Sequence, residues 1–120
     1  MWTTLEAMWG NAPLGTPDVL LGDFNLVESP IDRLPTHGDD RHATDALQKL
    51  LVSGNMNDGW RRENPAERSY TFAQSSTASQ SRIDRIYIKR QLESKTSRWD
   101  ILGSGIPTDH RMPVMAIANY

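Results

Sequence analysis

The sequence predicts a mixed α/β domain in which β-strands outnumber helices. Residues 18–24 (DVLLGDF) form a compact apolar run that is typical of a buried strand. Residues 43–55 (ATDALQKLLVSGN) carry apolar side chains at the spacing of an amphipathic helix. Residues 69–74 and 81–89 alternate between apolar and polar, and a serine-rich turn separates them, as in a β-hairpin. These patterns indicate one small domain built around a β-sheet.

The first third of the chain predicts a helix, a strand and a loop. Residues 3–11 (TTLEAMWGN) have a short amphipathic pattern that a threonine would cap. Glycines and prolines between residues 10 and 17 then end this helix. The strand at 18–24 follows, and residues 28–41 (ESPIDRLPTHGDDR) are polar, contain two prolines and predict a loop.

The remaining segments predict a second helix and about four strands. Thr44 would cap the helix at 43–55, and Gly54 with Asn55 would end it. Its apolar stripe would consist of Ala46, Leu47, Leu50 and Leu51. The predicted strands are 69–74, 81–89, 98–104 and 112–120.

One sheet of about five strands with its helices on one face would leave the other face uncovered. An uncovered apolar face is a surface for association with another chain. Depending on the register of the strands, the exposed set would include Leu20, Ile83, Tyr87 and Val114 or the residues that alternate with them.

Composition excludes several classes of protein. The 120 residues include no cysteine, which rules out disulfide bonds and cysteine-based zinc sites. No apolar run approaches the roughly 18 residues of a membrane span. The N-terminus also lacks the basic region and apolar core of a secretory signal. We therefore expect a soluble intracellular protein without membrane contact.

Charge is distributed unevenly along the chain. Residues 1–60 hold nine acids and three bases, a balance of −6, whereas residues 61–120 hold ten bases and six acids, a balance of +4. An acidic region beside a basic one suits a metal site next to a phosphate-binding face. Ordinary surface variation would give the same pattern, so charge alone leaves both interpretations open.

The strand at 18–24 runs into GDFN, which presents a carboxylate and a carboxamide two residues apart. On a strand, Asp23 and Asn25 would project together at the C-terminal end, where open α/β sheets bind ligands. A carboxylate can accept a proton from water or hold a hydrated cation, and an amide can donate to a phosphate oxygen. The structural alternative is that both side chains bond nearby backbone amides beside a turn at Gly22.

The stretch SRIDRIY, residues 81–87, places charged side chains on both faces of an apparent strand. Arg82 and Asp84 share one face, and Arg85 lies on the other. This pattern is unusual unless one face lines a site. The alternative is an edge strand whose charges prevent aggregation.

The stretch PTDHRMPV, residues 107–114, places Asp109 and His110 just before a predicted strand. One of these residues can contact a cation while its neighbour titrates near neutral pH. A catalytic histidine needs a partner that fixes its tautomer. Asp84 is the candidate partner if the two strands are neighbours.

In this order GDFN, SRIDRIY and TDH, with DGWRRENP and YTF between the first two, resemble the endonuclease/exonuclease/phosphatase superfamily. The resemblance is strongest to the endonuclease domains of non-LTR retrotransposons, which are similar to apurinic/apyrimidinic endonucleases. It covers nearly the whole chain but only the C-terminal half of the family domain. It implies a DNase I-like fold of two packed β-sheets flanked by helices, with the site at one end of the sandwich. It also implies a phosphoester substrate, with DNA as the expected partner, an intracellular location that includes the nucleus, and Mg²⁺ or Mn²⁺ as cofactor.

The resemblance further implies roles for individual residues. Asp23 would activate the attacking water, and Asn25 would orient the water or the phosphate. Asp109 would contribute to the metal site. His110 would stabilise the scissile phosphate, with Asp84 oriented against its ring.

Two other residues are expected to bind the substrate. Phe72 of YTF occupies a position where relatives place an apolar residue against the sugar or base, although packing explains it equally well. Arg82 is the basic residue expected to contact the substrate. The hydroxyl of the serine that usually precedes Asp-His in relatives is retained here by Thr108.

The chain departs from the family in one larger respect. In relatives an asparagine and a metal-binding glutamate come from the N-terminal half, and here only residues 1–17 precede the strand at 18–24. We therefore expect residues 1–120 to be a single partial domain that lacks the N-terminal half.

Three functions remain open from the sequence. The chain could be part of a Mg²⁺-dependent nuclease that is completed by the missing half. It could be a catalytically inactive retroelement remnant that keeps only the fold. It could also act on a phosphoinositide or another small phosphoester, although DRLP and DGWRRENP favour a retroelement endonuclease over such a phosphatase.

Overall fold

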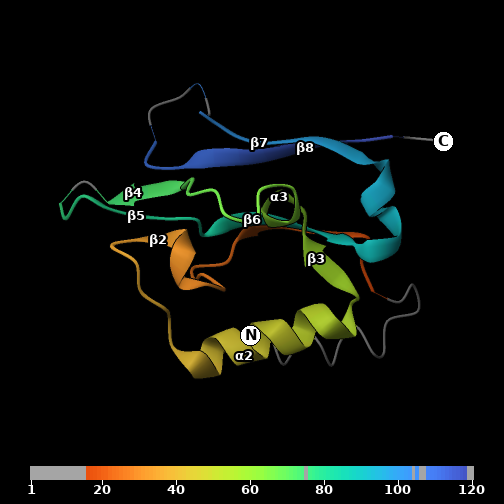
Figure 1. Cartoon of the computed structure of the whole chain (residues 1–120), viewed down its shortest axis with the longest axis horizontal. Helices are drawn as coiled ribbons and strands as arrows, with labels where there is room; N and C mark the ends of the chain where they lie inside the picture. Colours follow the sequence, from red (N-terminus) through yellow and green to blue (C-terminus); the bar gives the residue numbers. More distant parts are fainter. Residues whose placement is uncertain (1–15, 75, 104, 106–107, 119–120) are drawn as a thin grey trace.

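The computed structural model describes residues 16–74, 76–103, 105 and 108–118. In this part of the chain, short strands and short helices accompany one longer helix, α2, which lies along the lower edge of the view (Figure 1). The helix predicted at residues 3–11 lies outside the described residues. Within the described part of the chain, no helix has the length and apolar character needed to cross a membrane.

A three-stranded antiparallel sheet lies at the centre of the molecule (Figure 1). Its strands have the order β1-β6-β3 and comprise Val19–Asp23 (β1), Asp84–Lys89 (β6) and Met56–Asp58 (β3). The register pairs Leu20 with Tyr87 and Asp23 with Asp84. The strand predicted at 18–24 is therefore confirmed.

The other strands form two further sheets, so the single sheet expected from the sequence is wrong. One sheet has the order β2-β5-β4 and comprises Arg33–Leu34 (β2), Ser79–Ser81 (β5) and Phe72–Gln74 (β4). The other comprises Thr96–Gly103 (β7) and Arg111–Ile117 (β8). Three short helices complete the order: η1 (Pro30–Asp32), α3 (Gly59–Glu63) and η2 (Arg90–Lys95). The predicted hairpin is present as β4 and β5.

The segment predicted as one strand at 81–89 is divided between two sheets. β5 ends at Ser81 and β6 begins at Asp84. Between them the amide of Arg82 donates to the carbonyl of Asp32 (2.9 Å), and the amide of Ile83 donates to the hydroxyl of Thr71 (3.1 Å). These partners are distant in the sequence, which is why alternation alone did not reveal the break.

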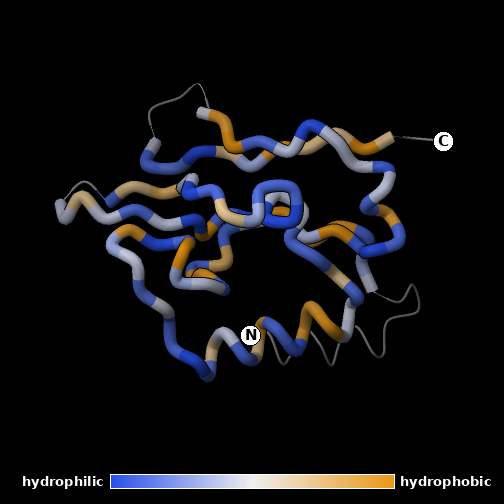
Figure 2. The backbone as a smooth tube through the Cα atoms, viewed as in Figure 1, coloured by the Kyte–Doolittle hydropathy of each residue, from blue (hydrophilic) through white to orange (hydrophobic). Residues whose placement is uncertain are grey.

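Helix α2 (Arg41–Ser53) confirms the helix predicted at 43–55, but its cap differs. The side chain of Asp40 accepts a hydrogen bond from the amide of Ala43 (3.2 Å), so Asp40 is the N-cap. Thr44, the predicted cap, lies inside the first turn and donates to the carbonyl of Arg41 (3.1 Å). Gly54 ends the helix as predicted. Hydrophobic and hydrophilic residues alternate along α2 (Figure 2).

The core lies between α2 and the central sheet. The ring of Tyr87 meets the ring of Phe24 edge to face, with centroids 5.0 Å apart. The whole buried cluster comprises Phe24, Leu26, Leu47, Leu50, Leu51, Met56 and Tyr87. On the other face of the sheet β8 packs against β6, and Ile86 and Ile88 are buried there. The central sheet is therefore packed on both faces, although Leu21 on its β1 edge stays exposed.

The uncovered apolar face expected from the sequence is present only in part, and with other residues than those named. Ile83 and Tyr87, two of the residues expected to be exposed, are buried. The exposed large apolar residues of the outer strands are instead Leu21, Leu102, Met112 and Ile117. They lie on β1, β7 and β8. β1 also carries Asp23, and β8 begins directly after His110.

Candidate active site

Two carboxylates meet where β1 ends and β6 begins. Asp23 and Asp84 are direct partners in the antiparallel register, and such partners project from the same face of a sheet. Gly22 precedes Asp23 with a φ of 145°, a conformation that favours glycine. Like charges placed directly opposite each other are destabilising. The pair therefore favours a cation or a protonated donor beside it.

His110 supplies that donor. Its Nδ1 lies 2.7 Å from Oδ2 of Asp84, which is a hydrogen bond between residues 26 positions apart. The hydroxyl of Thr108 accepts from the amide of His110 (3.2 Å), so the hydroxyl retained at this position fixes the backbone of the histidine. With Nδ1 bound to Asp84, Nε2 is the nitrogen available to a further ligand. The hydrogen bond predicted between Asp84 and His110 is thus present.

Phe72 lies against the histidine ring. It forms an isolated antiparallel bridge with His110, and the two ring centroids are 4.9 Å apart at an interplanar angle of 44°. The β4-β5 hairpin therefore reaches the same end of the molecule as the start of β8 (Figure 1). Packing against His110 accounts for Phe72, and its half-exposed side chain also borders the site.

Asn25 lies beside Asp23 in a turn, as in the structural alternative considered for GDFN, and not by strand alternation. β1 ends at Asp23, and Asn25 has a φ of 58°, outside the strand. Oδ1 of Asp23 accepts a hydrogen bond from the amide of Asn25 (2.9 Å). Asn25 is exposed, and asparagine tolerates this left-handed conformation better than most residues. The local turn, rather than strand alternation, holds the two residues together.

Asp109 and Arg82 are placed differently from the cluster. Asp109 is exposed; its carbonyl accepts from the amide of Ala73 (3.2 Å). Arg82 is only 1% exposed, and its guanidinium contacts Asp32 (2.8 Å) and Asp58 (2.7 Å). This burial does not support the substrate contact expected for Arg82.

One oxygen or nitrogen atom from each of Asp23, Asp84 and His110 lies within 4.8 Å of the other two. Asp109 is not a member of this group among the described residues. Hard divalent cations such as Mg²⁺ and Mn²⁺ prefer carboxylate oxygens as ligands. The donor set therefore fits a divalent cation, with the two aspartates as the oxygen ligands.

Thr71 is a supporting residue that the sequence did not single out. Its buried hydroxyl accepts from the amides of Ile83 (3.1 Å) and Asp84 (3.0 Å). Its carbonyl accepts from the amide of Arg111 (2.6 Å), the residue after His110. One threonine thus fixes the backbone at both members of the Asp84–His110 pair. Its place beside Phe72 in YTF was the available signal, but its burial could not be inferred from the sequence.

A shallow groove of about 300 Å³ adjoins the cluster. One end of the groove holds Asp23, Asp84 and His110, and the rest is lined largely by apolar side chains that include Leu21 and Met112. Leu21 is 66% exposed and Met112 48%. The cluster therefore sits at the mouth of an apolar groove and not in a closed pocket.

The sequence was compared with known families and proteins. Residues 1–110 match the profile of the Endonuclease/Exonuclease/phosphatase family. The chain belongs to this family. The chain is also 35% identical over 80 residues to the uncharacterized 149 kDa protein of transposon TX1 from Xenopus laevis. This match covers 64% of the chain and 6% of that protein.

Several solved structures share the fold of this chain. The 3′ phosphatase NExo from Neisseria, bound to a product DNA hairpin, superposes with a TM-score of 0.79 at 21% identity, covering 99% of this chain and 52% of that one. An AP endonuclease from Archaeoglobus fulgidus gives 0.76 at 23% identity, covering 97% and 52%. The endonuclease domain of TRAS1, a telomere-specific non-LTR retrotransposon, gives 0.70 at 18% identity, covering 97% and 49%. The present chain thus spans about half the length of the solved structures that it resembles.

Proposed function

We propose that this chain carries one half of a divalent-metal-dependent active site that hydrolyses phosphodiester bonds in DNA. The observation that carries the proposal is the cluster of Asp23, Asp84 and His110 at the mouth of the groove, with Asp84 bound to Nδ1 of His110. Family membership and the DNA product bound to one structural neighbour support this substrate class.

His110 acts on the phosphate. Asp84 accepts from Nδ1, which fixes the ring orientation and leaves Nε2 to donate to a phosphate oxygen. A donor already aimed at the oxygen where charge develops lowers the barrier without reorganisation during the reaction.

Asp23 acts on water. Its Oδ1 is occupied by the amide of Asn25, and its side chain is exposed, so Oδ2 can accept a proton from an attacking water. The exposed side chain of Asn25 next to it orients the water or a phosphate oxygen. Phe72 borders the site as the apolar contact for the sugar or base of the nucleotide.

Asp23 and Asp84 would hold the cation, whereas Asp109 lies outside their cluster, so its expected contribution to the metal site stays a prediction. When bound, Mg²⁺ or Mn²⁺ supplies charge neutralisation at the phosphate and orients water. Mg²⁺ requires six oxygen ligands, and water and substrate phosphate usually fill several of these positions.

The proposal places the remaining protein ligands outside these 120 residues. Purified alone, the chain should therefore nick supercoiled plasmid weakly or not at all in the presence of Mg²⁺. Robust nicking that His110→Ala abolishes would show instead that these residues suffice. The competing function, a fold that is retained without catalysis, predicts no nicking under any conditions.

Cation binding tests the site independently of turnover. We expect Mn²⁺ to broaden the NMR signals of Asp23, Asp84 and His110 before others, with reversal by EDTA and loss in Asp84→Asn. Asp45→Asn, which removes an exposed acid from α2, is the matched control and should change nothing. Equal broadening at all exposed acids would reject a built site.

A further inference from the structure

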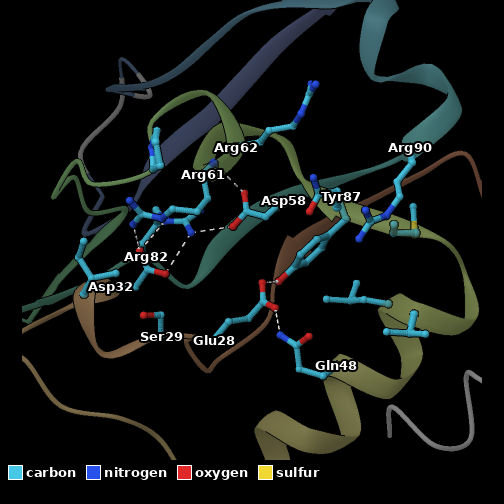
Figure 3. A pocket seen from close by; sticks show the side chains of 16 residues that line it. Glu28, Ser29, Asp32, Gln48, Asp58, Arg61, Arg62, Arg82, Tyr87 and Arg90 are labelled. Atoms are coloured by element: carbon cyan, nitrogen blue, oxygen red, sulfur yellow. Dashed lines mark hydrogen bonds and ion pairs between the residues drawn. The ribbon is translucent and has the colours of Figure 1, made fainter.

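A cavity of about 530 Å³ lies on the face of the central sheet that is opposite to the Asp23–Asp84–His110 cluster (Figure 3). On β6, Asp84 and Tyr87 are an odd number of residues apart and point to opposite faces. Tyr87 lines the cavity, whereas Asp84 binds His110. Side chains from α2, η1, β3, α3 and η2 complete the wall. Its volume falls in the range of small-molecule sites.

Two of the acids that line this cavity are already neutralised. Asp32 accepts from Nε of Arg82 (2.8 Å) and is also bound by Arg61. Asp58 accepts a hydrogen bond from Nη2 of Arg82 (2.7 Å). Figure 3 shows these side chains as one connected network on one side of the cavity. They therefore leave no uncompensated negative charge for a ligand to meet.

The third acid, Glu28, is held among neutral donors. Its carboxyl accepts from the hydroxyl of Tyr87 (2.6 Å) and from the side-chain amide of Gln48 (Figure 3). Burial raises the pKa of Glu28, although the Tyr87 hydrogen bond and the charge of Arg85 oppose this shift. The Glu28 carboxyl is thus already engaged by two hydrogen bonds from protein side chains.

Positive charge in the cavity is only partly compensated. Arg90 is exposed, and among the described residues no carboxylate forms an ion pair with it. Its side chain extends toward Tyr87 (Figure 3). Arg62 also lines the cavity, and it forms an ion pair with Glu93 (3.2 Å). The uncompensated group is therefore a guanidinium, which binds phosphate and carboxylate groups.

Part of the cavity wall is apolar. It includes Ile31, Leu51, Val52, Met56 and Pro65. Val52 is 77% exposed, although it lies in the last turn of an otherwise amphipathic helix. A wall that combines a guanidinium with apolar side chains complements an anion that also has an apolar body.

We propose that this cavity binds a small organic anion, with its phosphate or carboxylate on Arg90 and its apolar body against Val52 and Met56. The site is separate from the Asp23–Asp84–His110 cluster, because it lies across the sheet. Its occupation does not require the hydrolytic function proposed above.

The test is an amide NMR titration of the whole chain in EDTA with three probes. Phenyl phosphate carries a phosphate on an apolar ring, benzoate carries a carboxylate on the same ring, and inorganic phosphate lacks the body. We expect at least one organic probe to shift the amides of Val52, Asn57 and Arg90, with inorganic phosphate at least about tenfold weaker. Whichever organic probe binds more tightly identifies the anionic group.

Variants locate the site. Arg90→Gln should weaken the bound probe about tenfold or more, as expected for loss of a charged hydrogen bond. Val52→Asn removes the apolar contact without adding charge and should weaken binding of the organic probe, at a position exposed enough to leave folding intact. Arg41→Gln, which removes an equal charge from the exposed start of α2, should leave affinity unchanged. The proposal is overturned if neither organic probe binds at millimolar concentration, if shifts centre on Asp23 and His110, or if all three variants behave alike.

Discussion

Replacing Thr71 with valine removes one hydroxyl and keeps the shape of the side chain. That hydroxyl is the acceptor for the amides of Ile83 (3.1 Å) and Asp84 (3.0 Å). A buried donor left without a partner costs about 1–3 kcal/mol. Two such donors, one of them only partly buried, predict a loss of about 2–4 kcal/mol in the free energy of unfolding for Thr71→Val. Thr71→Ser keeps the acceptor and loses one methyl group, so it should cost about 1 kcal/mol.

Urea denaturation followed by tryptophan fluorescence measures both variants, because the buried Trp60 stacks with Arg82 near this junction. The ordering of the variants, with valine worse than serine, is the decisive result. If Thr71→Val stayed within about 0.5 kcal/mol of wild type, the hydroxyl would not be supporting the backbone at Asp84. Equal losses for valine and serine would assign the effect to packing and not to hydrogen bonding.

Three further predictions concern stability. Gly59→Ala would place a methyl group inside the indole of Trp99, so we expect a loss of about 1–3 kcal/mol in urea denaturation, and a neutral result would refute the close packing. Asp32→Asn breaks a buried ion pair with Arg82 and should cost about 3 kcal/mol; a loss below about 1 kcal/mol would show that Arg82 repairs the pairing elsewhere. Burial raises the pKa of Glu28 from its ordinary value of 4.5, so its contribution to stability is present below pH 4.5 and is lost as pH rises through the raised pKa. Urea midpoints across this range should fall less steeply in Glu28→Gln than in wild type, and parallel profiles would contradict the shift.

Local patterns predicted the elements whose partners are close in the sequence. The apolar run at 18–24 and the helical stripe near 43–55 gave β1 and α2, because each pattern reports burial of one face. The break after Ser81 could not be predicted in this way. It depends on Asp32, which lies fifty positions before Arg82 and holds both its backbone and its side chain. Propensity says nothing about such long-range pairs.

The candidate site shows the same division. The order of GDFN, SRIDRIY and TDH was sufficient to place Asp84 against His110, because a family pattern encodes contacts that periodicity cannot. Arg82 was expected to contact the substrate, but its burial depends on Asp32 and Asp58, which only the fold brings together. Thr71 was missed because a threonine in a predicted strand gives no sign in the sequence that its hydroxyl accepts hydrogen bonds from two distant amides.

Complementation in trans tests the central claim most directly. The chain would be mixed with the N-terminal half of the Archaeoglobus fulgidus AP endonuclease, and nicking of supercoiled plasmid and cleavage of abasic-site DNA would be measured with Mg²⁺ or with EDTA. Removal of a charge-stabilising donor typically costs 10²–10³-fold in rate, so His110→Ala should lower the restored rate by about two to three orders of magnitude. His42→Ala, which removes an exposed histidine from α2, should leave it unchanged. Mg²⁺-dependent cleavage that requires His110 but not His42 is the predicted result; cleavage that persists in His110→Ala would contradict the assignment of the active site to this cluster.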